Sequence, residues 1–336
     1  MYNKYLLLTA FILLLPGSLF AQKNETNEVV LRGPYLGQTP PGLKAEIFAP
    51  GIASTGLHDD MGPAFSPDGS EVFFRIAGYP YGIITTMKQV DGVWSKPDLA
   101  FWSGQYADSF VFFSHDGEKL YFASRRPVDG KGKPEERYAV WEVERSESGY
   151  GIPKQLGSML GNEETVYLAD LSNKGNFFMN REVTIDGNRT FETYSCQLED
   201  GKFVNPQKID LKIDPRYMTF AGTVDPDEKY MIMSIRNMED SLGSDDLYVS
   251  FHKEDGSWGT PIHLDDRVNS ANGDGWPRIS PDGKYLFFVS WRYEGETYSE
   301  KPVTYDEIIA KKKGHIYGWG ADIYWVSTEV IAEHRQ

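Results

Sequence analysis

Cysteine is almost absent from this sequence: Cys196 is the single thiol in 336 residues. One cysteine cannot form an intramolecular disulfide, so the fold does not depend on cross-links. Histidine is also scarce, and its six copies show no metal-ligand spacing, which argues against a zinc centre. We therefore expect no metal and no cofactor, with a bound Ca²⁺ ion held by carboxylates as the alternative.

Basic residues are in deficit. Lys and Arg number 34 against 49 Asp and Glu, which gives a formal net charge of −15. Such a charge disfavours nucleic acid and anionic membrane as partners, since both repel an acidic surface. It suits a soluble secreted protein, and we expect a monomer.

Long apolar runs are missing except at the N-terminus. Lys4 is the only charge in residues 1–21, and the apolar run that follows it is interrupted by Pro16-Gly17 and closes on Ala21. This pattern predicts a secretory signal peptide cleaved after Ala21, with an uncleaved anchor as the alternative. We thus expect a secreted or periplasmic bacterial protein with no membrane span after cleavage.

A short phrase recurs along the rest of the chain. FSPDG, FSHDG, LSNKG, VDPDE and ISPDG end at Gly69, Gly117, Gly175, Glu228 and Gly283, with steps of 48, 58, 53 and 55 residues. Repetition at such a period is typical of propeller blades or solenoid turns. Pro, Asp and Gly in this order favour a tight turn, so the phrase marks a hairpin and not a catalytic motif.

Each period contains signals for four strands and almost no helix, which predicts an all-β propeller with four antiparallel strands per blade. Five copies indicate five blades, with a sixth, degenerate blade as the alternative. The last copy lacks its fourth strand, whereas residues 43–48 form a strand without a blade. We expect this N-terminal strand to close the last blade. The predicted organisation is a signal peptide (1–21), a flexible segment (22–40), one propeller domain (41–330) and a tail (331–336).

The repeats FSPDGSEVFF, FSHDGEKLYFASR and ISPDGKYLFFVSWR, each followed later by a segment such as Asp245-Asp246-Leu247-Tyr248, resemble the TolB-type, WD-like β-propeller repeat. The resemblance covers most of the chain after residue 40. It implies the fold and leaves the function open, because such propellers serve as protein-binding modules, peptidase accessory domains and carbohydrate-active enzymes. The copies at Gly175 and Glu228 depart from SPDG. A Gly-x-Ser-x-Gly elbow is absent from the sequence.

Loop length is distributed unevenly between the two faces of the predicted ring. One face has only tight turns, and the opposite face takes the long connections, where binding sites usually lie. The predicted loops between second and third strands are residues 76–82, 125–137, 181–190, 235–246 and 291–321. A short helix is expected within the last of these, at residues 304–313.

Charged residues recur beside this long-loop face. Asp60, Asp108 and Asp274 each lie nine residues before a turn glycine, so all three should enter an innermost strand at the same height. Arginines mark the exits of the second strands. The candidate ligand-binding residues are His58, Asp60, Asp108, Glu164, Asp274, Trp276, Arg125, Arg236 and Arg292.

Two functions fit this set. The first is a non-catalytic module that binds a glycan, peptide or protein partner on the long-loop face. The second is a carbohydrate-active hydrolase or lyase that uses carboxylates among Asp60, Asp108, Glu164 and Asp274. The sequence favours the first, because no residue set specifies a reaction. Against both stands a structural interpretation, in which the Asp–Arg pairs brace neighbouring blades.

Overall fold

The structure is a computed structural model that describes residues 30–55, 60–76, 81–146, 148–157, 166–292, 304 and 320–335, with only the backbone at residues 60 and 61. Residues 31–336 form one compact unit. The predicted signal peptide and the predicted helix lie outside the described residues, apart from Thr304. Within the described ranges, no helix is long and apolar enough to cross a membrane.

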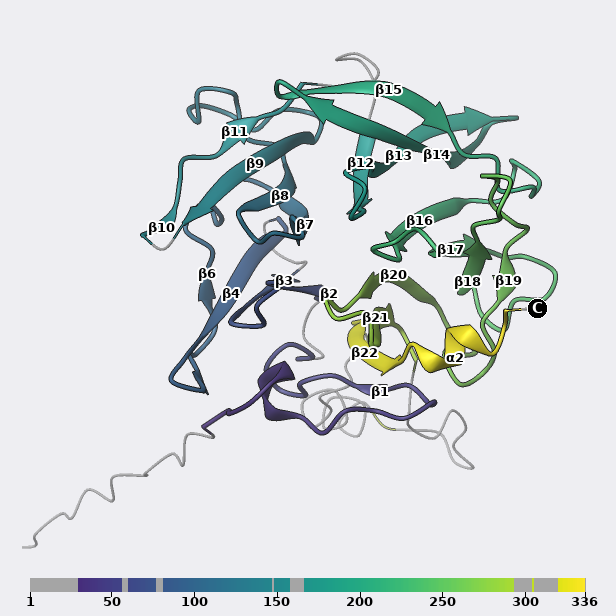
Figure 1. The fold of residues 1–336 in the computed structure, drawn as a ribbon, viewed down its shortest axis with the longest axis horizontal. Coiled ribbons are helices and arrows are strands. Elements are labelled where there is room, and N and C mark those ends of the chain that lie inside the picture. Colours follow the sequence, from purple (N-terminus) through teal and green to yellow (C-terminus); the bar gives the residue numbers. More distant parts are fainter. Residues whose placement is uncertain are drawn as a thin grey trace, which may run out of the picture. The chain divides into compact units, whose positions relative to one another are not determined.

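Five antiparallel sheets make up this unit, and their strands follow chain order from the innermost strand outward, except that β1 is the outermost strand of the last sheet (Figure 1). Blade 1 contains β2 (Asp60–Phe65), β3 (Glu71–Ile76), β4 (Ile83–Val90), β5 (Val93–Trp94) and β6 (Asp98–Leu99). Blade 2 contains β7 (Asp108–Phe113), β8 (Lys119–Ser124), β9 (Ala139–Ser146), β10 (Gly149–Tyr150) and β11 (Lys154–Gln155). In both blades two short pieces replace a single outer strand.

The other blades complete the ring. Blade 3 contains β12 (Val166–Leu171), β13 (Phe177–Ile185), β14 (Asn188–Glu199) and β15 (Lys202–Lys208). Blade 4 contains β16 (Thr219–Val224), β17 (Tyr230–Arg236), β18 (Asp245–Phe251) and β19 (Ile262–His263). Blade 5 contains β20 (Asp274–Ile279), β21 (Tyr285–Ser290), β22 (Asp322–Ser327) and β1 (Glu46–Ile47). The protein is therefore a five-bladed β-propeller, as the turn count predicts.

Ring closure by the N-terminal strand is confirmed. β1 pairs antiparallel with β22, placing Glu46 opposite Trp325 and Ile47 opposite Tyr324. The Phe48 amide extends the ladder by donating to the Ile323 carbonyl at 2.7 Å. The strand therefore covers the edge that β22 would otherwise expose.

Aromatic packing seals the junction between blades 5 and 1. Phe48 is fully buried, and its ring lies 5.0 Å from that of Phe287 and 5.1 Å from that of Trp325. Phe65 of β2 joins the same core at 6.1 Å from Phe48. Large rings on alternating strand positions thus bury the inner faces of both sheets against each other.

The boundaries of the propeller differ from those predicted. The short helix η1 (Tyr35–Gly37) lies in the segment predicted to be flexible, yet Leu36 is buried in the core at the closure point. At the other end, α2 (Glu329–Ala332) buries Val330 and Ile331. Apolar side chains at both ends extend the compact unit to residues 31–336, beyond the predicted 41–330.

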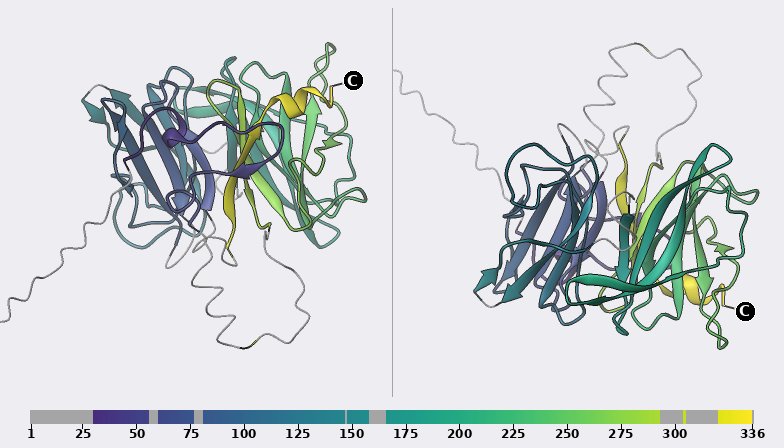
Figure 2. Two further views of the ribbon diagram at one scale, coloured as in Figure 1. Left: turned by 90° about the horizontal axis from the view of Figure 1, so that it is seen from below. Right: turned by 90° about the horizontal axis from the view of Figure 1, so that it is seen from above.

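The SPDG phrases form the turns between first and second strands. In the first copy, Ser66 donates from its hydroxyl to Asp68 Oδ1 at 2.6 Å, and Asp68 Oδ1 also accepts from the Ser70 amide at 2.9 Å. Gly69 takes a φ of 69°, which favours glycine. These turns lie on the same face as α2, as Figure 2 shows with the blades edge-on, and this face is called the tight-turn face below.

One predicted loop is wrong. Residues 181–190 are not a loop, because β13 and β14 continue through them to a two-residue hairpin at Asp186-Gly187. Asp186 and Gly187 have φ values of 51° and 80°, as a type I′ turn requires. The Asp-Gly pair between two strand-forming runs is itself the signal for this hairpin.

Candidate functional site at the long-loop face

The aspartates predicted to lie at one height do occupy equivalent positions. Asp60, Asp108 and Asp274 are the first residues of β2, β7 and β20. Val166 and Thr219 begin the inner strands of blades 3 and 4, as the count along the chain indicates. The repeat therefore predicts correctly, in all five blades, which residue begins the innermost strand.

The two aspartates whose side chains are described, Asp108 and Asp274, each form an ion pair with an arginine. Asp274 Oδ1 lies 3.0 Å from Arg292 Nη2, and Asp108 Oδ1 lies 3.0 Å from Arg126 Nη2. Both carboxylates are completely buried. Burial raises the pKa of Asp108, although hydrogen bonding to Ser124 and the charge of Arg126 oppose the shift. These two carboxylates therefore brace the sheet, and they do so within a blade, not between neighbouring blades as the sequence interpretation has it.

Other predicted residues do not converge on the aspartates. Arg125 donates from Nε to the Glu135 carbonyl, and Arg236 forms a bidentate pair with Asp245. His58 and Glu164 lie outside the described residues, and only the backbone of Asp60 is described. Their assignment to a ligand site stays a prediction.

Trp276 has a different neighbour. Its ring lies 5.2 Å from that of Trp291, and both side chains are half-buried. Trp276 has a φ of 45°, and the register of β20 shifts between Gly275 and Arg278, so it lies in a β-bulge. Bulges re-aim side chains, which explains why spacing alone does not predict the direction of Trp276.

A cluster of half-buried aromatic rings occupies the long-loop end of the inner strands, and we call it the aromatic cluster. Its members come from blades 2, 3 and 4, and none is fully buried or fully exposed. They are Phe110, Tyr138, Tyr167, Phe191 and Phe220.

The rings form one continuous surface across the channel. Phe110 of β7 lies 5.5 Å from Tyr167 of β12 and 5.8 Å from Phe220 of β16. Blades 2 and 4 are not neighbours in the ring, so the contact between Phe110 and Phe220 spans the channel. Phe191, on the hairpin of blade 3, adds a fourth ring 5.1 Å from Phe220. The aromatic cluster therefore lies at this mouth of the channel.

A polar group borders the aromatic cluster. Arg189 donates from Nη2 to Glu182 Oε2 at 2.7 Å, and the Tyr167 hydroxyl donates to the same oxygen at 3.2 Å. The hydrogen bond from Arg189 holds the pKa of Glu182 below its usual range. The Arg189 side chain is about half exposed at 52%, so it retains N–H donors for a ligand.

The sequence contains a signal for this surface that the predicted site does not include. Tyr167 and Phe220 each lie eight residues before their turn residue, and Phe110 lies seven before its own. Phe110, like Trp276, has a positive φ, here 52°, at a register shift in its strand. Counting one residue further along the inner strands of blades 3 and 4, and two further along that of blade 2, thus leads to the aromatic cluster.

In the part of the chain that the structure describes, no three His, Cys, Asp or Glu side chains lie close enough together to hold a metal ion. The predicted Ca²⁺ alternative depends on carboxylates, and the side chains of two of them, Asp60 and Glu164, are not described. It stays a prediction.

Comparison with known proteins identifies no family. No family model matches the chain, and no curated protein matches it. Membership of the TolB-type repeat family therefore stays a prediction.

Solved structures show a likeness in fold. A putative TolB from Agrobacterium tumefaciens is 18% identical over 72% of this chain and 73% of its own, with a TM-score of 0.42. TolB from Acinetobacter baumannii is 16% identical over 70% of this chain and 50% of its own, with a TM-score of 0.42. The catalytic domain of a GH62 α-L-arabinofuranosidase from Coprinopsis cinerea is 10% identical over 86% of this chain and 98% of its own, with a TM-score of 0.45. At these identities the likeness concerns the fold alone.

Proposed function

We propose that this protein is a secreted, non-catalytic binding module that holds a neutral glycan against the aromatic cluster. The observation that carries the proposal is the continuous contact of half-buried rings from three blades at one mouth of the channel. Ligand sites are typically concave, mostly apolar and aromatic, with a few well-placed polar groups. The aromatic cluster with Glu182 and Arg189 has this composition.

A sugar ring suits this surface chemically. It has an apolar C–H face that can lie on an aromatic ring and hydroxyl edges that need both donors and acceptors. Tyr167, Glu182 and Arg189 supply both kinds of group beside the rings. Because most of the rings lie on strands, their positions are fixed before the ligand arrives, which reduces the entropy lost on binding.

Charge favours a neutral glycan over an acidic one. The chain has a formal net charge of −15, and Glu182 already neutralises Arg189. A polyuronate would therefore meet long-range repulsion, and Arg189, the cation that borders the aromatic cluster, is already paired with Glu182.

Affinity electrophoresis through gels that contain neutral polysaccharides, such as a β-glucan, a mannan and a xylan, tests the proposal. We expect one of these polymers to retard the protein, and Phe191→Ala to abolish the retardation. Phe101→Ala is the matched control, because Phe101 is an exposed ring of 57% accessibility that does not belong to the aromatic cluster. Equal retardation of both variants, or migration unaffected by any glycan, would contradict the proposal.

The hydrolase or lyase alternative predicts a different result in the same samples. Release of reducing ends or unsaturated products from the retarding polymer would show turnover. Since Asp108 and Asp274 are buried in ion pairs, turnover would have to depend on Asp60 or Glu164. Loss of product formation in Asp60→Ala or Glu164→Ala would then support the enzyme.

A further inference from the structure

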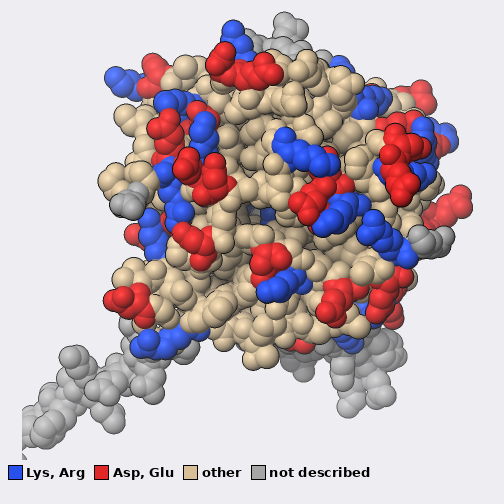
Figure 3. Space-filling view, in the orientation of Figure 1, with Lys and Arg blue, Asp and Glu red and all other residues tan. Residues whose placement is uncertain are grey.

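The opposite mouth of the channel has its own pocket. Its lining comes from all five inner strands and their turns, with a cavity volume of about 60 Å³. Figure 3 shows this tight-turn face, hollowed at its centre between scattered acidic and basic side chains. The pocket is small, so it suits one functional group of a ligand and not a whole sugar chain.

A layer of equivalent residues lines this pocket. Each lies five residues before its turn residue, and together they are Ala64, Phe112, Asp170, Thr223 and Arg278. Four of them line the pocket directly, and Thr223 holds Asp170 from behind through its hydroxyl. Arg278 provides the one cation of the layer and Asp170 the one anion. Because the five positions are equivalent by repeat, the difference in charge between them is a property of this chain and not of the fold.

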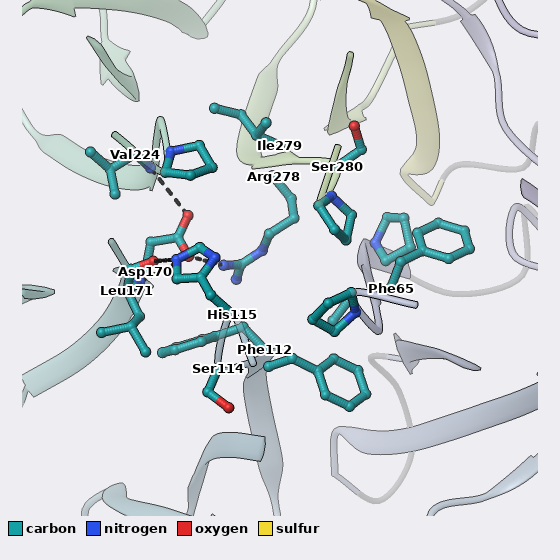
Figure 4. A pocket seen from close by; sticks show the side chains of 16 residues that line it. Phe65, Phe112, Ser114, His115, Asp170, Leu171, Val224, Arg278, Ile279 and Ser280 are labelled. Carbon is teal, nitrogen blue, oxygen red and sulfur yellow. Dashed lines mark hydrogen bonds and ion pairs between the residues drawn. The ribbon is translucent and has the colours of Figure 1, made fainter. Parts of the chain in front are cut away.

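Arg278 reaches across the channel. Its Nη1 donates to the Ala169 carbonyl of blade 3 at 2.9 Å and lies 3.5 Å from Asp170 Oδ1. Its guanidinium also covers the Phe112 ring at 5.5 Å. Figure 4 shows the guanidinium extending from β20 toward the middle of the pocket, close to Asp170. Nε and Nη2 donate to no acceptor among the described residues, so three of the five guanidinium donors are available.

Asp170 does not use all the hydrogen-bond donors of the Arg278 guanidinium. Its Oδ2 accepts from the Thr223 hydroxyl at 2.5 Å and from the Val224 amide at 3.1 Å, so blade 4 holds the carboxylate. Oδ1 accepts from the Leu171 amide at 3.0 Å and lies 3.5 Å from Arg278 Nη1, so the pair lacks bidentate geometry. Burial lowers the pKa of Arg278, and the negative charge of Asp170 opposes this shift. The loss of hydration therefore destabilises the charged guanidinium more than Asp170 stabilises it.

The remaining walls are rigid and largely apolar. Pro63, Pro67, Pro226 and Pro281 line the pocket beside phenylalanine rings. His115 is held by a 2.6 Å contact between Nε2 and the Leu171 carbonyl, and since a carbonyl only accepts, Nε2 carries the proton. A charge-assisted bond formed among such walls is less weakened by water than one on an open surface.

We propose that Arg278 is a docking group for a single carboxylate, which enters from the tight-turn face and accepts hydrogen bonds from Nε and Nη2. A monoanion carried on a small apolar body fits better than a phosphate. Asp170 in the lining would repel a higher negative charge, as would the nearby turn aspartates Asp68, Asp116 and Asp282, and the prolines favour apolar contact. The carboxylate can belong to a free small acid or to the end of a peptide chain.

The test is a titration of the ¹⁵N-labelled full chain, followed by the Nε–H signal of Arg278. Propionate is the first probe, and we expect it to shift this signal, which is assigned by its loss in Arg278→Lys. Arg278→Lys should weaken propionate binding at least about tenfold, because a lysine cannot form the bidentate pair. Arg216→Lys is the matched control, since Arg216 is an exposed arginine paired to Asp214.

Asp170→Asn should change the affinity for propionate in the opposite direction. It removes the competing charge and keeps an acceptor for Thr223, so propionate should bind several-fold more tightly. An Nε signal that does not move, equal affinity in Arg278→Lys, or unchanged affinity in Asp170→Asn would each overturn the proposal. N-acetyl-prolyl-glycine and its C-terminal amide distinguish the sources. Tighter binding of the free peptide acid than of propionate assigns a chain end, whereas equal affinity assigns a free small acid.

Discussion

Arg292 donates from Nη2 to Asp274 Oδ1 at 3.0 Å, and the same guanidinium donates from Nε to the Ser290 hydroxyl and from Nη2 to the Val268 carbonyl. Arg126 repeats these contacts in blade 2, with Asp108, Ser124 and the Trp102 carbonyl. One side chain thus links the start of a first strand, the end of a second strand and the preceding inter-blade loop. Blades 2 and 5 share this strut.

The ion pair between Asp274 and Arg292 predicts that a change at Asp274 lowers the stability of the fold. Asp274→Ala should lower the free energy of unfolding by about 3–5 kcal/mol, because it leaves the Arg292 charge largely buried without its partner. Chemical denaturation followed by tryptophan fluorescence measures the change.

Its control is the double variant Asp274→Ala with Arg292→Leu. This variant removes both charges, so it should recover part of the lost stability. A single variant that unfolds within about 0.5 kcal/mol of the wild type would contradict the bracing role.

Ring closure predicts a second effect at Phe48. Phe48→Ala should cost about 3–5 kcal/mol, because the side chain is fully buried against Phe287 and Trp325. Leu43→Ala, a change at an exposed side chain of the same segment, should cost much less. Equal stabilities for the two variants would mean that the N-terminal strand does not seal the ring.

Glu228, which stands where the other copies have glycine, predicts a pH dependence. Burial would raise its pKa, but hydrogen bonds from Ser172, Asn176 and Lys174 outweigh burial and hold it below its usual range. A lowered folded-state pKa stabilises the protein above the unfolded-state pKa, and this contribution is lost as pH falls through the folded-state value.

The matching variant is Glu228→Gln. It should be less stable than the wild type by about 1–2 kcal/mol at pH 7, and the difference should shrink below about pH 4. Denaturation curves at a series of pH values test both parts. A difference that grows toward low pH would refute the assigned role of the carboxylate.

The hairpin of blade 3 predicts a conformational cost. Gly187 has a φ of 80°, and a Cβ added there would meet no atom within 4 Å, so the cost of Gly187→Val is one of backbone geometry. We expect a loss of about 1–2 kcal/mol. Gly42→Ala adds a Cβ in equally open space without a positive φ and should be nearly neutral. Comparable losses in both variants would rule out the type I′ turn.

Much of the fold follows from the sequence because its signals are local and repeated. The turn residues from Gly69 to Gly283 predict five blades, and the unpaired strand at residues 43–48 predicts its pairing with β22. The Asp186-Gly187 hairpin also has a local turn signal, which the predicted loop at residues 181–190 does not take into account. The packing of Leu36 and Ile331 was not predictable from local pattern, because each side chain is buried by residues distant in sequence.

The candidate site was harder to predict than the fold. Counting along the chain gives the height of Asp108 and Asp274 correctly, but not that each carboxylate pairs with an arginine of its own blade. Every inner strand contains a register shift, which changes the direction of the side chains beyond it. Phe110 and Phe220 meet across the channel, and no spacing along one blade reveals that contact.

The most direct test of the account is a calorimetric titration with an oligosaccharide from the polymer that retards the protein. The wild type and Phe101→Ala should bind it with the same affinity, whereas Phe191→Ala should bind about 30-fold more weakly, since a central aromatic contact contributes about 2 kcal/mol. Unchanged affinity in Phe191→Ala would contradict the assignment of the aromatic cluster as the binding surface.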